Sequence, residues 1–149
     1  YIMTPYFIPG EEILSALKIS AESGVDVRLI TPSISDNKPI HVVTRSKYAT
    51  LIESGVKVYE YMPGFIHSKT IVSDDVIATC GSVNMDYRSL YLHFECGSVV
   101  FGNNTAMDIK EDFMNTLSEC QMISLEQSLK CRFWQRLYLA LIRTFEPLL

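Results

Sequence analysis

Residues 66–89 decide the fold, and they read IHSKTIVSDDVIATCGSVNMDYRS. This stretch holds two polar signatures on either side of a short apolar run: His67-x-Lys69-x-x-x-x-Asp74, then Gly81-Ser82-x-Asn84-x-Asp86-x-Arg88-Ser89. Small and β-branched residues predict a strand over 66–73, and the Asp74-Asp75 pair suits a tight turn. We therefore expect the chain to double back through 76–80 as a hairpin.

The hairpin brings the two signatures together. With a two-residue turn, Lys69 lies opposite Cys80 and His67 lies opposite Ser82. Alternate side chains of a strand share a face, so His67 and Lys69 point the same way, and Asn84 follows on that face. The pattern thus predicts an imidazole, an ammonium and a carboxamide at one end of the hairpin.

These three groups suit phosphate chemistry. A neutral imidazole attacks phosphorus or transfers protons near neutral pH. Lys69 and Asn84 can hold the non-bridging oxygens of a phosphodiester while negative charge builds on them. His67 has no second His, Cys or carboxylate at ligand spacing, so we expect neither a metal site nor a cofactor.

With these signatures the chain resembles the phospholipase D superfamily, whose hallmark is the HKD motif. The wider sequence is similar to the C-terminal half of bacterial cardiolipin synthases. The similarity extends over nearly the whole chain, through the segments TPYFIP (4–9), GVDVR (24–28), YEYMPGF (59–65) and the closing PLL (147–149). It implies a phospholipase D-like half-domain of the α/β class, with a mixed, largely parallel sheet flanked by helices.

The resemblance implies a two-step phosphatidyl transfer, in which two phosphatidylglycerol molecules give cardiolipin and glycerol through a covalent phosphohistidine. The chemistry needs two HKD motifs, and this chain supplies one. The other is expected from an N-terminal half of the same protein or from a second copy, so an isolated monomer should be inactive. The residues do not settle whether His67 is the nucleophile or the general acid; its place in a second motif favours the acid.

The implied catalytic set is completed by Asp74 and Glu95. A reacting histidine needs its other ring nitrogen held by an acceptor, and the family places a Glu after Asn-Phe for this purpose. Here that segment reads His93-Phe94-Glu95, with His in place of Asn. Asp74 belongs to the motif but falls on the opposite strand face from His67, which indicates a structural role in the turn.

Four further residues are assigned to binding or support. Ser82 is a candidate hydrogen-bond donor to substrate, and Arg45 is a candidate headgroup contact, because the family shows an Arg-Ser pair there. A solvated helix face is an equally good interpretation of Arg45. Asp86 and Arg88 are predicted to form a supporting ion pair beside the site.

The remaining pattern predicts the other elements. Strands are expected over 1–6, 25–30, 56–62 and 91–101, and helices over 11–23, 41–54, from Asn103 or Asn104 to about 122, and from about 125 onward. The order strand–helix–strand at the start favours a parallel pair, and the polar loop 31–39 should border the ligand crevice. We divide the chain into a catalytic domain, 1–123, and a C-terminal amphipathic helical segment, 124–149, packed on it.

Composition limits the partners. A net charge of −4 argues against a nucleic-acid binder, whereas the last segment, with four basic and two acidic residues around Trp134, could also lie on anionic lipid. No apolar run is long enough to span a bilayer, and a start at Tyr1 in mid-strand suggests a fragment. For the full protein the resemblance implies the cytoplasmic face of the cell membrane.

Two other functions stay open from the residues. The same motif serves phosphodiesterases and nucleases, for which this chain would be a half-site. A non-catalytic interaction module is the alternative outside enzymes, against which the intact His67, Lys69, Asn84 and Glu95 argue.

Overall fold

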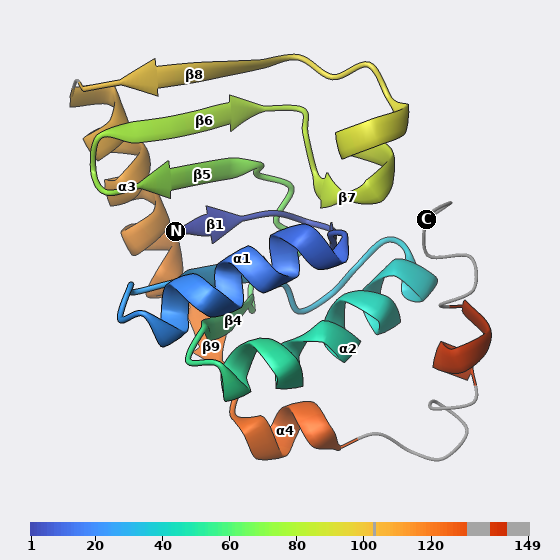
Figure 1. Ribbon diagram of the computed structural model, residues 1–149. Coiled ribbons are helices and arrows are strands. Elements are labelled where there is room, and N and C mark those ends of the chain that lie inside the picture. Colours follow the sequence, from blue (N-terminus) through green and yellow to red (C-terminus); the bar gives the residue numbers. More distant parts are fainter. Residues whose placement is uncertain (103, 131–137, 143–149) are drawn as a thin grey trace.

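The computed structural model describes residues 1–102, 104–130 and 138–142 of the chain. In these ranges a seven-stranded sheet, in the order β8-β6-β5-β1-β3-β4-β9, has helices on both faces (Figure 1). Its strands are β1 (Ile2–Met3), β3 (Arg28–Pro32), β4 (Lys57–Tyr61), β5 (Thr70–Ser73), β6 (Ile77–Gly81), β8 (Gly97–Phe101) and β9 (Cys120–Met122). A second small sheet pairs β2 (Phe7–Ile8) with β7 (Met85–Asp86). The helices are α1 (Glu11–Glu22), α2 (Lys38–Glu53), η1 (Arg88–Leu92), α3 (Asn104–Leu117) and α4 (Leu125–Leu129).

The predicted fold class is confirmed. Strands β1, β3 and β4 are parallel and form the centre of the sheet, so the predicted strand–helix–strand unit at the start of the chain is present. Strands β5, β6 and β8 add to one side in antiparallel fashion, and β9 closes the other side against β4. The sheet is therefore mixed, with its parallel pairs at the centre.

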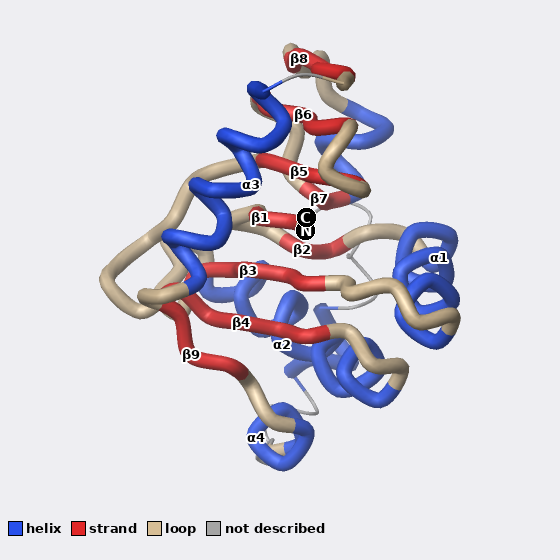
Figure 2. The backbone as a smooth tube through the Cα atoms, turned by 90° about the vertical axis from the view of Figure 1, so that its left-hand side faces the viewer, coloured by secondary structure: helices blue, strands red, loops and turns tan. Residues whose placement is uncertain are grey.

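Apolar clusters lie on both faces of the sheet. Figure 2 views the strands nearly end-on, with α3 on one side and α1 and α2 on the other. On the side of α1 and α2, Leu14, Tyr48 and Leu51 pack against sheet residues such as Leu29 and Val58. On the opposite side, α3 contributes Phe113 and Ala106 to separate clusters. Neighbouring residues of each strand point to opposite faces, which is why adjacent apolar residues enter different clusters.

Local features of the sequence explain where α2 begins and where α1 and α2 end. The Asn37 side chain caps α2 by accepting a hydrogen bond from Ile40 N at 3.3 Å. Helices α1 and α2 are followed by Gly24 and Gly55, whose φ angles of +93° and +95° favour glycine. The chain can therefore reverse sharply into β3 and β4.

The predicted hairpin is present, but its register was wrong by one residue. Ser73 pairs with Ile77, and Thr70, rather than Lys69, lies opposite Cys80. The turn holds three residues, of which Asp74 and Asp75 have positive φ angles of 52° and 61°. This extra residue shifts every pair, and β5 begins only at Thr70, so His67 and Lys69 precede the strand.

Two other element predictions were wrong. The strand expected over 91–101 begins at Gly97, because the preceding residues form the wide turn η1, in which Arg88 O accepts from His93 N at 2.8 Å. The helix expected to reach about residue 122 ends at Leu117, and Cys120–Met122 instead pairs with β4 as β9. The turn η1 is closed by this local hydrogen bond, whereas β9 forms by pairing with a strand far away in the sequence, which overrides the local pattern.

The C-terminal segment is described only in part. Helix α4 has a capping box between Ser124 and Gln127. Residues 138–142 are helical, and Leu139 and Ile142 pack on a cluster that contains Ile8 and Val43. The basic, aromatic and apolar positions of the predicted amphipathic helix that lie outside the described residues are Arg132, Phe133, Trp134, Arg136, Leu137, Arg143 and Phe145.

The close approach of β6 and β8 gives a stability prediction. A Cβ atom at Gly81 would lie 2.5 Å from both Cys96 O and Gly97 Cα, so the Gly81→Ala change must force the two strands apart. We expect it to lower the free energy of unfolding by about 1–3 kcal/mol, measured by urea denaturation. Gly64→Ala, whose Cβ would meet nothing within 4 Å, is the matched control. Equal stability of the two variants would contradict the prediction.

Candidate functional site

The candidate site lies at one end of the strands of the sheet. Parallel strands β1, β3 and β4 end there, and antiparallel β5 begins there (Figure 1). His67 and Lys69 occupy the connection that leads into β5, and Asn84 lies between β6 and β7. The two signatures of the sequence therefore meet at this end of the strands, as the hairpin predicted.

His67 and Lys69 are in direct contact. Lys69 Nζ lies 3.2 Å from Nδ1 and 3.1 Å from Nε2 of the imidazole, and it donates a hydrogen bond to His67 O at 2.9 Å. Partial burial lowers the pKa of Lys69, while the nearby carboxylates of Glu95 and Asp86 act in the opposite direction. A cation thus stands directly beside an exposed imidazole.

Asn84 contributes a buried polar atom without a partner. Its Oδ1 is buried and has no hydrogen-bond partner among the described residues. Such an atom costs folding free energy, about 1–3 kcal/mol. Rotation of the amide group by 180° exchanges its oxygen and nitrogen, so this side chain can either accept a hydrogen bond from a ligand or donate one to it.

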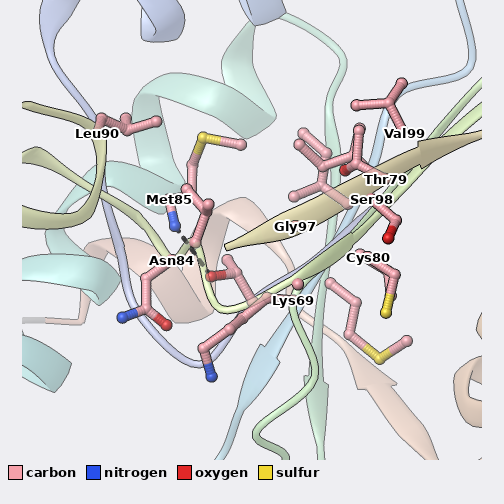
Figure 3. A pocket seen from close by; sticks show the side chains of 16 residues that line it. Lys69, Thr79, Cys80, Asn84, Met85, Leu90, Gly97, Ser98 and Val99 are labelled. Carbon is pink, nitrogen blue, oxygen red and sulfur yellow. Dashed lines mark hydrogen bonds between the residues drawn. The ribbon is translucent and has the colours of Figure 1, made fainter. Parts of the chain in front are cut away.

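Lys69 and Asn84 line the same cavity of about 340 Å³. Figure 3 shows their polar ends near each other, with Leu90 and Val99 farther along the wall. The cavity thus combines a cation and an amide with an apolar remainder. Such a site fits a phosphate ester with an apolar substituent.

The structure places Ser82 and Glu95 together. The Ser82 hydroxyl donates to Glu95 Oε2 and accepts from Cys96 N at 3.0 Å. The hydrogen bond from Ser82 holds the pKa of Glu95 below its usual value. Glu95 was predicted to hold the ring of His67; in this structure its carboxylate is hydrogen-bonded to Ser82, and both ring nitrogens of His67 lie next to Lys69.

The predicted Asp86–Arg88 ion pair was wrong. Asp86 is buried, and its Oδ1 accepts from Ser89 N at 2.7 Å, so the carboxylate caps the start of η1. Arg88 Nη2 instead lies 2.9 Å from Nε2 of His93. Two residues apart on a turning backbone, the side chains of Asp86 and Arg88 diverge.

Asp74 and Arg45 lie away from Lys69 and Asn84. Asp74 is in the turn at the far end of β5, where it accepts from Ser73 Oγ at 3.1 Å, about 17 Å along the strand from Lys69. Arg45 belongs to α2 and lines a different hollow, with Glu60 on its wall. Its guanidinium donates to both carboxylate oxygens of Glu60, from Nε at 2.7 Å and Nη2 at 2.5 Å.

Sequence reasoning missed three residues beside the site. Phe65 stacks at a tilt on His67, with ring centroids 5.5 Å apart, and Tyr6 lies 6.3 Å from Phe65. The Tyr6 hydroxyl in turn donates to Asp36, in the polar loop expected to border the crevice. The signal was present, because Tyr6 and Phe65 stand in two of the quoted family segments, but neither bears a reactive group.

Metal coordination finds no support in this region. Within the described ranges, no three His, Cys, Asp or Glu side chains are grouped closely enough to hold a metal ion.

The pairing of Arg45 with Glu60 gives a second stability prediction. The Glu60 side chain is only 4% exposed, so Arg45→Met leaves a buried carboxylate without its cation. Arg45 is itself half-exposed, and we expect a loss of about 1–3 kcal/mol on unfolding in urea, which a second change, Glu60→Gln, should largely reverse. Lys57→Met, which removes an exposed contact to Asp26, is the control and should cost less than about 1 kcal/mol. A substrate contact without a structural role would leave the stability of Arg45→Met unchanged.

Comparison with known proteins gives a consistent picture. A family profile described as "Cardiolipin synthase, PLD-like domain" matches residues 1–117. Cardiolipin synthase 2 of Bacillus anthracis is 40% identical over 149 residues, all of this chain and 29% of that protein. Cardiolipin synthase of Halalkalibacterium halodurans is 42% identical, again over all of this chain and 30% of that protein. The chain thus spans about a third of the length of these relatives.

Two solved structures share the fold. Nuc, a phospholipase D family member from Salmonella typhimurium, superimposes with a TM-score of 0.68 at 21% identity, covering 82% of this chain and 79% of that one. Phosphatidylserine synthase from Haemophilus influenzae gives 0.71 at 18% identity, covering 99% and 41%. The family profile and the relatives that match the whole chain lead to one conclusion: this chain belongs to the phospholipase D-like domain family of the cardiolipin synthases.

Proposed function

We propose that this chain supplies one of the two His/Lys sets of a phosphatidyltransferase that makes cardiolipin from two molecules of phosphatidylglycerol. The observation that carries the proposal is that Lys69, in contact with His67, lines one cavity together with Asn84, whose buried Oδ1 lacks a partner among the described residues. An anionic phosphodiester would give the cation a partner, and it would accept a hydrogen bond from the Asn84 amide once rotation by 180° brings the NH2 group to the position of Oδ1. The family relationship supports the choice of a phospholipid over other phosphodiesters.

The reaction is a double displacement at phosphorus. A histidine nitrogen attacks the phosphodiester, an N–P bond forms, and the bond from phosphorus to the departing glycerol oxygen breaks as the other histidine donates a proton to it. The hydroxyl of a second phosphatidylglycerol then gives its proton to the proton-donating histidine and attacks phosphorus. The N–P bond breaks, and the attacking histidine is released. We assign the acid–base role to His67, and the stabilisation of the phosphoryl oxygens to Lys69 and Asn84.

The supporting residues have distinct roles in this proposal. Ser82 holds Glu95 by a hydrogen bond, and the Glu95 carboxylate keeps a negative charge near the ammonium of Lys69. Asp74 holds the turn of the hairpin, and Asp86 holds η1 in place behind Asn84. Arg45 contacts a headgroup only if it can do so while still bound to Glu60.

A second His/Lys set must lie at this end of the strands. The part of the sheet that the helices leave uncovered is a candidate contact surface for the domain that carries it. One row of side chains crosses the face on which α1 and α2 lie, in the order Val58, Leu29, Ile2, Ile71, Thr79 and Val99. Val58 is 0% and Ile2 6% exposed, Ile71 and Thr79 are intermediate, and Val99 is 55% exposed. The helices thus cover only half of this face, and Lys69 lies beside the open half.

Other apolar side chains extend the open area. Ile77 and Phe101 form the neighbouring pair of the same face, and both are exposed. Phe94 and Leu92, on the segment that leads into β8, are exposed as well. Such an area marks a contact surface, and we assign it to the domain that carries the second set, from the N-terminal half or a second copy.

The membrane enters the proposal through the substrate. None of the helices in the described ranges has both the length and the apolar character needed to cross a bilayer. We propose that the full protein acts at the cytoplasmic face of the cell membrane, and that the C-terminal segment contacts anionic lipid.

The function is tested on purified chain with short-chain phosphatidylglycerol. We expect no cardiolipin from the monomeric fraction and cardiolipin from any dimeric fraction, detected by mass spectrometry. His67→Ala should reduce the dimer's rate at least about a thousandfold, whereas His93→Ala, a change at another exposed histidine, should not. Transfer by the monomer, an active His67→Ala dimer, or hydrolysis of single-stranded DNA instead of lipid would each refute the proposal.

The proposed contact surface is tested separately, by measuring the molar mass of the chain in solution. We expect the chain to self-associate as concentration rises in light scattering, and Val99→Lys to abolish this association because it places a charge in the apolar face. Met107→Lys, at an exposed methionine on α3, is the control and should associate like the original chain. Equal association of both variants would show that the copies meet elsewhere.

A further inference from the structure

Three aromatic rings form a row that ends at the candidate catalytic histidine. Phe65 and His67 have ring centroids 5.5 Å apart and an interplanar angle of 41°, and Tyr6 and Phe65 follow at 6.3 Å and 38°. Tyr6 comes from the segment between β1 and β2, whereas Phe65 and His67 lie in the connection from β4 to β5. The row therefore joins two separate parts of the chain at the site.

The far end of the row is fixed by hydrogen bonds. The Tyr6 hydroxyl donates to Asp36, with the two carboxylate oxygens at 2.7 and 2.8 Å. Burial, together with the Asp36 carboxylate, raises the pKa of Tyr6 to about 12, so the hydroxyl keeps its proton at neutral pH. The Tyr6 carbonyl accepts from Thr4 Oγ1 at 2.8 Å, and the same Thr4 oxygen accepts from Met85 N at 3.2 Å. Tyr6 is thus tied to the loop before α2 and to the residue after Asn84.

His67 needs such support because it is not part of a strand. Residues 65–69 have no regular secondary structure, so no ladder of hydrogen bonds fixes the direction of this side chain. Its ring is exposed, and its nitrogens lie beside a single flexible lysine. Glu95, the residue expected to orient it, is hydrogen-bonded to Ser82.

We propose that Phe65 positions the imidazole of His67, and that Tyr6 and Asp36 hold Phe65 in place. The ring contact sets the plane of the imidazole, while Lys69 lies along its nitrogen-bearing edge. Aromatic contacts of this kind favour one arrangement roughly two- to tenfold. The polar loop before α2 thereby affects the orientation of His67 through Asp36, although Asp36 itself does not touch substrate. The importance for catalysis rests on His67 being a reacting group, as proposed above.

The first test reads the ring itself by NMR of the purified chain. Phe65→Leu keeps an apolar side chain but removes the ring, and we expect the carbon-bound protons of the His67 imidazole to lose their ring-current shift. Phe65→Tyr should restore it. Tyr91→Leu, which breaks the separate Tyr87–Tyr91 ring pair at 4.7 Å, is the matched control and should leave the His67 signals in place. Signals of His67 that respond equally to both Leu variants, or to neither, would overturn the proposal.

A second variant covers the case in which Phe65→Leu fails to fold. Tyr6→Phe deletes only the oxygen that binds Asp36 and keeps all three rings. We expect the His67 ring protons to broaden or split as the row loosens, at an unchanged circular dichroism spectrum. A His67 spectrum identical to that of the original chain would show that the bond to Asp36 has no effect on the site.

The third readout separates positioning from binding. In an active dimer, Phe65→Leu should lower kcat about five- to tenfold with KM changed less than twofold, and Phe65→Tyr should recover the rate. A change in KM alone would assign Phe65 to substrate binding and overturn the proposal. The NMR result does not depend on cardiolipin synthesis, so a failure of the proposed function and a failure of this positioning role can be told apart.

Discussion

The antiparallel pairing of β5 with β1 determines where His67, Lys69 and Asn84 lie. Ile2 pairs with Ile71 and Met3 with Thr70, at the point where the parallel part of the sheet changes to the antiparallel part. Because of this reversal, the residues that precede β5 meet the residues that follow β1. His67 and Lys69 therefore lie near Thr4 and Tyr6, and the return of β6 brings Asn84 to the same place. A parallel β5 would have carried His67 and Lys69 to the opposite end of the strands.

Much of this arrangement could be predicted from the sequence. The hairpin, the parallel unit at the start and the convergence of Lys69 with Asn84 follow from period-2 patterning and from turn residues. The register could not be predicted, since it depends on whether the turn holds two residues or three. Positive φ angles at Asp74 and Asp75 permit both, and only the contacts of β6 with its neighbours decide.

The contacts of Glu95 and Arg45 could not be predicted for a different reason. Their roles were expected from the family resemblance, whereas the partner that a carboxylate or a guanidinium binds is the one that the fold brings nearest. For Glu95 this is Ser82, reached because Ser82 lies beside Cys96 at the end of the β6–β8 ladder. For Arg45 it is the buried Glu60, one strand away from the expected crevice. The positioning row of Tyr6 and Phe65 was missed for the converse reason, that its members carry no reactive group.

The same local pairing explains how an acidic chain can present a site for an anion. Asp86 caps η1, Glu60 binds Arg45 and Glu95 accepts from Ser82, so each of these carboxylates is hydrogen-bonded to a partner other than Lys69. Through space, Glu95 and Asp86 still favour the charged form of Lys69 against the cost of its burial. Lys69 therefore lies at the cavity with two carboxylates that favour its charged form, next to an amide oxygen that lacks a partner among the described residues. In the proposed reaction, a phosphodiester would displace no internal ion pair there, and its charge would meet groups that the fold already holds in place. The proposal requires such preorganisation of one His/Lys set before the second reaches it.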